Sequence, residues 1–323
     1  MILIFSFEFE VTTTKVVEWL VHCGVDVVVL NEWNRIRSIE YLQDGAELSI
    51  KVCTTSNVCF RIDEMSAVWY RRGQFHYREE KSSVNLQEFH DHDRKEWDIL
   101  NEQLMEELRN KPMIADFLLG DVNKLKVLKL AAQIGLNIPK TLIADNRATV
   151  LKHFCNSRII NKTIDNVLHQ EIDQQLFMNR TVEVFAQTLP VTFFPSKFQE
   201  LIEKEYELRI FYLNGECFAS AIFSQSNEKT VIDFRNYDYS KPNRTVPYKL
   251  PIELSNKLVK LMTSLNLNTG SIDIIVGKDG RFYFLEVNPV GQFGMVSAPC
   301  NYGLEQLVAR TLLREDERST ANC

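Results

Sequence analysis

The stretch that most constrains this chain is SIDIIVGKDGRFYFLEVN, residues 271–288. Two alternating apolar runs flank an Asp-Gly pair, which favours a two-residue turn because both central positions need a positive φ. A turn centred on that pair places Asp273 directly opposite Glu286. Asn288 shares their face, because side chains alternate along a strand. The stretch therefore predicts a β-hairpin that gathers three oxygen donors at its open end.

Two facing carboxylates repel each other on a sheet, and a divalent cation would remove that cost. Mg²⁺ takes one or two carboxylates together with phosphate and water oxygens, so Asp273, Glu286 and Asn288 form a candidate metal site. The alternative is a solvated polar face at a sheet edge. Phe282 and Phe284 on the same strand favour the metal site, because a solvated face rarely carries such residues.

A second hairpin is predicted in ELRIFYLNGECFASAIF, where Asn-Gly marks another type I′ turn. Glu207 and Arg209 share one face of its first strand. They could simply pair with each other, and exposed pairs contribute little. The functional alternative is that Arg209 holds a phosphate or carboxylate through its planar guanidinium.

Two lysines are candidate phosphate ligands, although a lone lysine is usually a surface residue. Lys124 begins a predicted helix. Lys162 lies inside the otherwise apolar predicted strand IINKTI, which is a less usual place for a surface lysine.

Composition excludes several classes of protein. A chain of 323 residues with a net charge of −6 is long enough for two or three domains and does not suggest a nucleic-acid partner. No apolar run reaches membrane-spanning length. Glu8 and Glu10 interrupt the apolar start, which predicts a first strand and not a signal peptide. Seven scattered cysteines without metal-binding spacing predict reduced thiols and a cytoplasmic location.

The periodicity of apolar residues predicts three parts. Residues 1–113 alternate strand and helix patterns and form a small α/β domain that includes a helix over 85–110. Residues 114–195 and 196–323 each combine helices with strands. Motifs for the P-loop, the Rossmann phosphate loop and the serine nucleophile elbow are absent from the sequence.

Several short motifs occur in an order that resembles the ATP-grasp superfamily. They are VWYRRG, NKLKVLKLAAQIGLNIPKT, IINKTI, FQELIEKEYELRIFYL, VIDFRNYD and FLEVNPVGQF. More narrowly, the chain resembles the ATP-grasp ligases that make graspetides, the microviridin-type and "grasp-with-spasm" maturases. The resemblance implies an α/β and α+β architecture: an N-terminal α/β domain and two α+β subdomains that enclose ATP.

The resemblance also implies roles for individual residues. Lys124 and Lys162 would contact ATP phosphates, and Asp273, Glu286 and Asn288 would bind Mg²⁺. Arg209 and Arg235 would hold the γ-phosphate and an acyl phosphate, while Glu207 would meet ribose or substrate. The hinge that reads adenine would be Glu200, Leu201 and Ile202.

The implied activity is ATP-dependent macrocyclisation of a ribosomal precursor peptide. Asp or Glu side chains would be activated as acyl phosphates and joined to Thr or Ser hydroxyls or to Lys amines, by a homodimer. Two alternatives stay open: a ligase that adds amino acids to a peptide or small acid, and a non-catalytic ATP-binding module. No glycine occurs between Gly135 and Gly215, whereas many members carry a glycine-rich loop. Leader contacts are sought in residues 165–185 and in Arg71 and Arg72.

Overall fold

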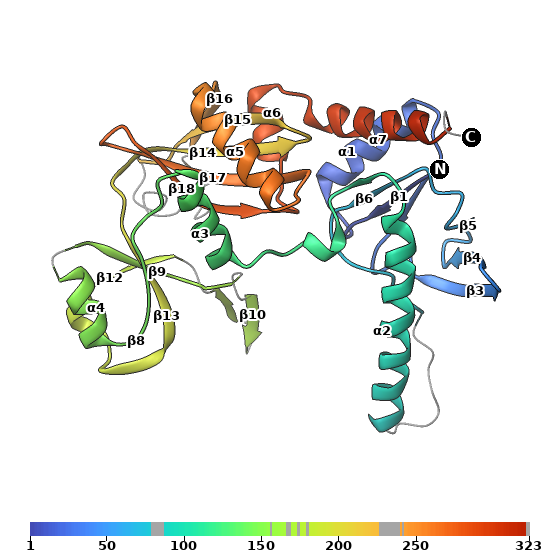
Figure 1. The fold of residues 1–323 in the computed structure, drawn as a ribbon, viewed down its shortest axis with the longest axis horizontal. Coiled ribbons are helices and arrows are strands. Elements are labelled where there is room, and N and C mark those ends of the chain that lie inside the picture. The colour runs from blue at the N-terminus through green and yellow to red at the C-terminus, as the bar shows by residue number, and fades with distance from the viewer. Residues whose placement is uncertain are drawn as a thin grey trace. The chain divides into compact units, whose positions relative to one another are not determined.

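The computed structural model describes residues 1–78, 87–155, 157–165, 169–172, 175–178, 181–225, 240 and 242–320. The chain forms two compact units (Figure 1). One comprises Met1–Asp121 with Gln292–Cys323, and the other comprises Val122–Gly291. The domain boundaries that the sequence predicts near residues 113 and 195 stay a prediction.

The first unit contains a four-stranded parallel sheet in the order β2-β1-β6-β7. Its strands are β1 (Ile2–Phe5), β2 (Val27–Leu30), β6 (Ala67–Tyr70) and β7 (Met113–Ile114). All four residues of β1 are buried, as expected where a parallel sheet is covered on both faces. Helix α1 (Val11–His22) packs against α7 (Leu304–Thr320), and α7 also contacts β6.

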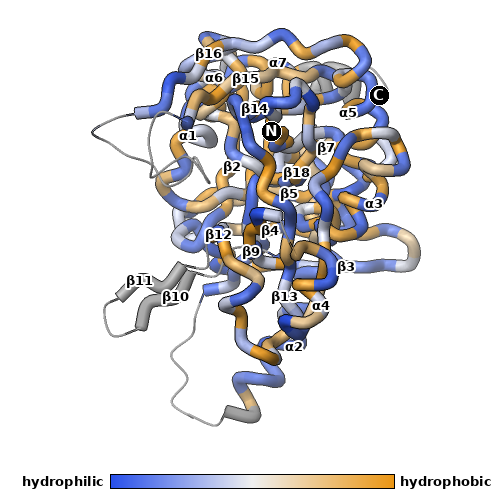
Figure 2. Tube along the Cα trace, turned by 90° about the vertical axis from the view of Figure 1, so that its left-hand side faces the viewer, coloured by the Kyte–Doolittle hydropathy of each residue, from blue (hydrophilic) through white to orange (hydrophobic). Residues whose placement is uncertain are grey.

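The long helix α2 (Gln87–Arg109) confirms the helix predicted over 85–110, of which residues 85 and 86 lie outside the described residues. Its C-terminal half adds Leu104, Met105 and Leu108 to the core of the first unit. The tube of α2 mixes hydrophilic and hydrophobic colours in Figure 2, which fits a helix that buries only one side. Two shorter helical segments of this unit are η1 (Phe117–Leu119) and α6 (Gly294–Cys300).

A separate antiparallel sheet of the first unit joins β3 (Ile36–Asp44), β4 (Glu47–Thr54) and β5 (Cys59–Arg61). Cys53 and Cys59 face each other across β4 and β5 and form a disulfide. The prediction that the cysteines are all reduced is therefore wrong for this pair. The two cysteines are six positions apart in the sequence and meet because a tight turn pairs β4 with β5, which the overall cysteine pattern did not indicate.

The second unit is built on two antiparallel sheets. The larger has the order β16-β15-β14-β17-β18, and the smaller has the order β12-β9-β13-β8. The larger contains β14 (Lys204–Leu213), β15 (Glu216–Phe223), β16 (Arg244–Tyr248), β17 (Thr269–Gly277) and β18 (Phe282–Asn288). The smaller contains β8 (Thr141–Asn146), β9 (Ile159–Lys162), β12 (Val182–Val184) and β13 (Thr192–Glu200).

Helices cover both sheets of the second unit. Helices α3 (Lys124–Ile134) and α5 (Ile252–Ser264) lie beside the larger sheet in Figure 1, where α3 contacts β18 and α5 contacts β15. Helix α4 (Arg147–Phe154) and η2 (Ala186–Thr188) pack on the smaller sheet, with Val150, Phe154 and Phe198 in its core. Strands β10 (His169–Ile172) and β11 (Gln175–Met178) pair with each other. No helix in the described ranges is long and apolar enough to span a membrane.

The two predicted hairpins differ in outcome. Asn214 and Gly215 both have positive φ between paired Leu213 and Glu216, so the predicted type I′ turn is confirmed. The two-residue turn predicted at Asp279 and Gly280 is wrong. There the amide of Gly277 donates to the carbonyl of Arg281, which leaves a three-residue loop.

A β-bulge compensates for that longer loop. Ile274 pairs with Phe284, whereas Asp273 pairs with Glu286, so Leu285 is the extra residue. The bulge shifts the register by one position, and the predicted pairing of Asp273 with Glu286 is confirmed. Without this shift, every residue beyond Phe284 would face the opposite side of the sheet.

Candidate functional site

A row of charged side chains crosses the larger sheet of the second unit. Arg209 on β14 pairs in register with Asp273 on β17, and Asp273 pairs with Glu286 on β18. The flanking positions Leu208 and Ile274 are buried apolar residues, so the alternation of side chains places the charges together on one face.

Arg209 and Asp273 form a largely buried ion pair. Nη1 of Arg209 donates to Oδ1 at 2.6 Å and to Oδ2 at 2.7 Å, and the two side chains are only 12% and 14% exposed. Nε of Arg209 is buried and has no hydrogen-bond partner within the described structure. An unsatisfied buried donor costs about 1–3 kcal/mol, so this atom is suited to receive an anionic ligand.

Glu207 does not pair with Arg209, although the two lie on the same face of β14. Its carboxylate accepts hydrogen bonds from Nζ of Lys204 at 2.5 Å and from Oγ of Ser224 at 3.0 Å. Burial raises the pKa of Glu207, while Lys204 opposes this effect. The sequence analysis assigned no role to Lys204, which is the first residue of β14.

Lys124 and Glu286 form an ion pair. Nζ of Lys124, at the first position of α3, lies 3.2 Å from Oε2 of Glu286. Asn288 pairs in register with Ser271, two positions further along β18. No group of three His, Cys, Asp or Glu side chains within the described ranges could hold a metal. Two carboxylates and one amide oxygen match the sparse protein ligation that Mg²⁺ accepts.

The smaller sheet contributes two lysines. Lys162 at the end of β9 pairs in register with Lys197 of β13. Lys197 is only 5% exposed. Burial, with Lys162 and Lys124, lowers its pKa to about 8, and Glu286 partly opposes this shift. The four groups are thus close enough to interact electrostatically, and three of them are cations.

The sequence prediction missed Lys197. Its signal is the same one that marked Lys162: a lysine inside an apolar strand, here FFPSKFQE. The predicted hinge segment FQELIEKEYELRIFYL begins at Phe198, one position after Lys197, and the sequence analysis gives Lys197 no role.

The predicted hinge lies between β13 and β14. The amide of Glu200 donates to the carbonyl of Lys140, and that of Leu201 donates to the carbonyl of Arg158. Both amides therefore donate within the protein. Of the three predicted hinge residues, all of which the structure describes, only Ile202 has an amide without such a backbone hydrogen bond to another described residue. The predicted contact of this segment with adenine stays a prediction, as do the other ligand roles. Arg235 lies outside the described residues.

Comparisons with known proteins identify the fold. No family model and no curated protein matches the chain. An ATP-grasp ligase of Chryseobacterium gregarium, associated with ribosomally synthesised and modified peptides and solved with ADP and a leader and core peptide, is 21% identical with a TM-score of 0.84. That match covers 100% of this chain and 97% of the ligase.

Two further solved structures are similar over almost the whole chain. The macrocyclase MdnC of Microcystis aeruginosa, bound with precursor peptide MdnA, is 25% identical with a TM-score of 0.76, covering 97% of this chain and 99% of MdnC. The ATP-grasp ligase PsnB, complexed with minimal precursor, Mg and ADP, is 16% identical with a TM-score of 0.72, covering 98% of both chains. The chain therefore has the ATP-grasp fold, and the resemblance to peptide-modifying ATP-grasp ligases expected from its sequence is confirmed.

Proposed function

We propose that this chain is an ATP-dependent ligase that closes macrocycles in a ribosomal precursor peptide. The observation that carries the proposal is the cluster of lysines around a pair of facing carboxylates, next to an arginine whose buried Nε has no partner within the described structure. Such a site is suited to a polyphosphate and a hard cation together. The precursor peptides bound to similar ligases support the choice of substrate.

The residues present fit ATP and Mg²⁺. Lys124, Lys162 and Lys197 would neutralise the phosphates of ATP. Asp273 and Glu286 would hold Mg²⁺, with Asn288 as a neutral third donor. When bound, Mg²⁺ would offset part of the negative charge on the phosphates.

The reaction begins with a carboxylate of the peptide, which is a poor electrophile. Its oxygen would attack the γ-phosphorus of ATP, the bond from that phosphorus to the bridging oxygen would break, and ADP would leave. A hydroxyl or amine of the same peptide would then attack the acyl carbon and lose its proton. Phosphate would leave, and an ester or amide would remain. Among the residues that the structure describes, Arg209 is the side chain best suited to hold the transferred phosphoryl group, because its buried Nε has no hydrogen-bond partner there.

Other parts of the assignment belong to the same proposal. The link is an ester or an amide, the enzyme acts as a homodimer, and it works in the cytoplasm. Disulfides are rare in the cytoplasm, so the Cys53–Cys59 disulfide counts against that location. Alkylation and mass spectrometry of protein taken directly from cells test the point: a largely reduced pair would support the cytoplasmic location, and a fully oxidised pair would contradict it.

The decisive experiment incubates the protein with ATP, Mg²⁺ and the peptide encoded by a short neighbouring gene rich in Thr or Lys and Asp or Glu. Loss of whole waters from the peptide, seen by mass spectrometry, is the expected result. A gain of amino-acid residues would instead favour the ligase that extends peptides, and no consumption of ATP would favour a non-catalytic module.

A matched pair of variants tests the metal site. Glu286→Gln removes one carboxylate charge at constant shape and should abolish ATP turnover while the circular dichroism spectrum stays unchanged. Glu253→Gln, at an exposed glutamate of α5, is the control and should leave turnover intact. Full activity of Glu286→Gln would show that the hairpin is not the metal site.

A further inference from the structure

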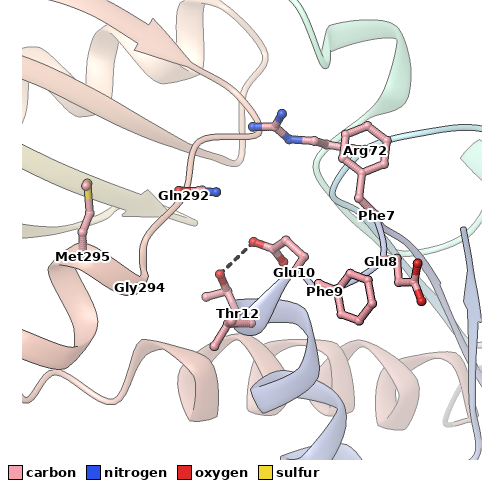
Figure 3. A pocket seen from close by; sticks show the side chains of 10 residues that line it. Phe7, Glu8, Phe9, Glu10, Thr12, Arg72, Gln292, Gly294 and Met295 are labelled. Carbon is pink, nitrogen blue, oxygen red and sulfur yellow. Dashed lines mark hydrogen bonds between the residues drawn. The ribbon is translucent and has the colours of Figure 1, made fainter. Parts of the chain in front are cut away.

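The first unit has a cavity of its own at the N-terminal end of α1 (Figure 3). Its volume is about 440 Å³, within the usual range for pockets that hold a small ligand or a few side chains. Phe7, Phe9 and Arg72 line it from the side of β1 and β6. Gln292 lines it from the segment that leads into α6, and Met295 lines it from α6 itself.

The aromatic side chains of this cavity are unusually exposed. Phe9 is 88% exposed, and its neighbour Phe7 is also exposed. Phe9 has a φ of 59°, in the left-handed region that strains a residue with a bulky side chain. Packing does not account for this residue, since its ring is almost entirely open to solvent. A strained, exposed aromatic residue beside a cavity points to contact with a ligand.

The charges around the cavity leave one cation available. Nη2 of Arg71 donates to Oε1 of Glu10 at 3.0 Å, and both of these side chains are largely buried, so Glu10 is already neutralised. The guanidinium of Arg72 lies 5.8 Å from the centre of the Phe7 ring and forms no ion pair in the described part of the chain. Glu8 also lines the cavity, on the far side of Phe9 from Gln292 in Figure 3.

An unpaired arginine stacked on an aromatic ring is suited to bind a carboxylate, because the guanidinium offers two parallel N–H donors and its stem is already ordered. The apolar side chains beside it would contact the hydrocarbon part of a ligand. The ligand that matches both features is an acidic side chain within an apolar peptide segment.

We propose that this cavity binds an Asp or Glu side chain of the precursor peptide, with Arg72 on the carboxylate and Phe7 and Phe9 against the neighbouring apolar residues. The peptide as occupant rests on the proposed function. The cavity belongs to the first unit, whereas every predicted nucleotide or metal ligand in the described residues lies in the second. It would therefore be a recognition site in addition to the site of phosphoryl transfer.

The test uses two blocked tripeptides, acetyl-Leu-Glu-Leu-amide and acetyl-Leu-Gln-Leu-amide, titrated into the full-length protein and followed by NMR. The wild type should prefer the Glu peptide by about tenfold or more, the size expected for a charge-assisted hydrogen bond. Arg72→Gln should lose this preference and bind both peptides equally. Arg72→Lys should retain part of it, and Arg310→Gln, at an exposed arginine of α7, should retain all of it.

Phe9→Gly supplies an independent readout. Glycine removes the strain at φ 59°, so the melting temperature should stay the same or rise, while both tripeptides should bind severalfold more weakly. A lower melting temperature with unchanged binding would show that Phe9 serves the fold, and would overturn its role as a ligand contact. Equal binding of both tripeptides by the wild type would overturn the site itself.

Titration of ADP into the same proteins separates the two proposals. Binding of ADP without any preference for the Glu peptide would leave the proposed function standing and reject the cavity. Preference for the Glu peptide without binding of ADP would do the reverse.

Discussion

At the scale of single residues, Asp273 has two competing partners. Arg209 pairs with it in the structure, and the same carboxylate would ligate Mg²⁺. Replacing Arg209 by Met leaves Asp273 and Glu286 facing each other with less compensating charge. We expect Arg209→Met to bind Mn²⁺, a spectroscopic substitute for Mg²⁺, about tenfold more tightly without nucleotide, and to lose catalytic turnover. Weaker Mn²⁺ binding, measured by electron paramagnetic resonance, would contradict a shared Asp273.

Lys197 is a second residue that lowers the stability of the fold while it serves the proposed ligand site. Its pKa is lowered from 10.5 to about 8 in the folded protein, mainly by burial. The folded state thus holds this proton less tightly than the unfolded chain. The resulting cost is fully present below pH 8 and disappears as the pH rises through 10.5. Lys197→Met should therefore raise the free energy of unfolding at pH 7 by roughly 3 kcal/mol, and by much less near pH 10.

The same variant should bind ADP more weakly, because one cation of the phosphate site is lost. Urea unfolding at the two pH values and titration of ADP measure both effects. Lys129→Met, at an exposed lysine of α3, is the control and should change neither. A Lys197→Met protein that is less stable at pH 7 would contradict the uncompensated burial of this amine.

At the scale of secondary-structure elements, Glu10 ties α1 to the segment after β6. Its carboxylate accepts a hydrogen bond from the amide of Thr13 at 2.9 Å, capping α1, and it pairs with Arg71. Burial alone would raise the pKa of Glu10, but Arg71 and the threonine hydroxyls outweigh burial and lower it to about 2. The stability that this charge supplies is present above pH 4.5 and is lost as the pH falls from 4.5 to about 2.

Glu10→Gln should therefore lower the free energy of unfolding at pH 7 by roughly 3 kcal/mol, and the difference from wild type should shrink at pH 3. Urea unfolding at both pH values measures this. Glu18→Gln, at an exposed position of the same helix, should have little effect at either pH. A Glu10→Gln difference that is equal at pH 7 and pH 3 would mean that shape, and not charge, holds α1 in place.

Local patterns in the sequence predicted these elements where the cause is local. The turn at Asn214 and Gly215 formed as predicted, because both residues tolerate positive φ. The loop at Asp279 did not, yet Asp273 still met Glu286, because the bulge at Leu285 corrected the register. A bulge depends on packing across the sheet, so the sequence pattern alone could not reveal it.

Contacts between residues that are far apart in the sequence were not predicted, for a related reason. Lys197 is adjacent to Lys162 only because β13 pairs with β9 in one particular register. Likewise, a pair of Arg209 with Glu207 was one of the two alternatives, but the sheet gives Arg209 Asp273 as its partner. These pairings are set by strand order, which no short motif determines.

At the scale of the whole molecule, the chain leaves the first unit at Asp121 and returns to it at Gln292. Helix α7 then packs against α1 and β6, so the two ends of the chain build one unit together. All the predicted ligands of ATP and Mg²⁺ in the described residues lie between these two crossings. Nucleotide binding should therefore belong to the second unit alone.

A fragment of residues 122–291 should accordingly fold and bind ADP with Mg²⁺ at an affinity within about tenfold of the full chain, a difference of about 1.4 kcal/mol. It should not bind the Glu tripeptide selectively, because Arg72 and the cavity at α1 are absent. Circular dichroism establishes folding, and calorimetric titration of ADP measures the affinity. The same fragment with Glu286→Gln is the control and should show a much weaker dependence on Mg²⁺. A folded fragment that fails to bind ADP would mean that the first unit supplies part of the nucleotide site, and the ligand set proposed above would then be incomplete.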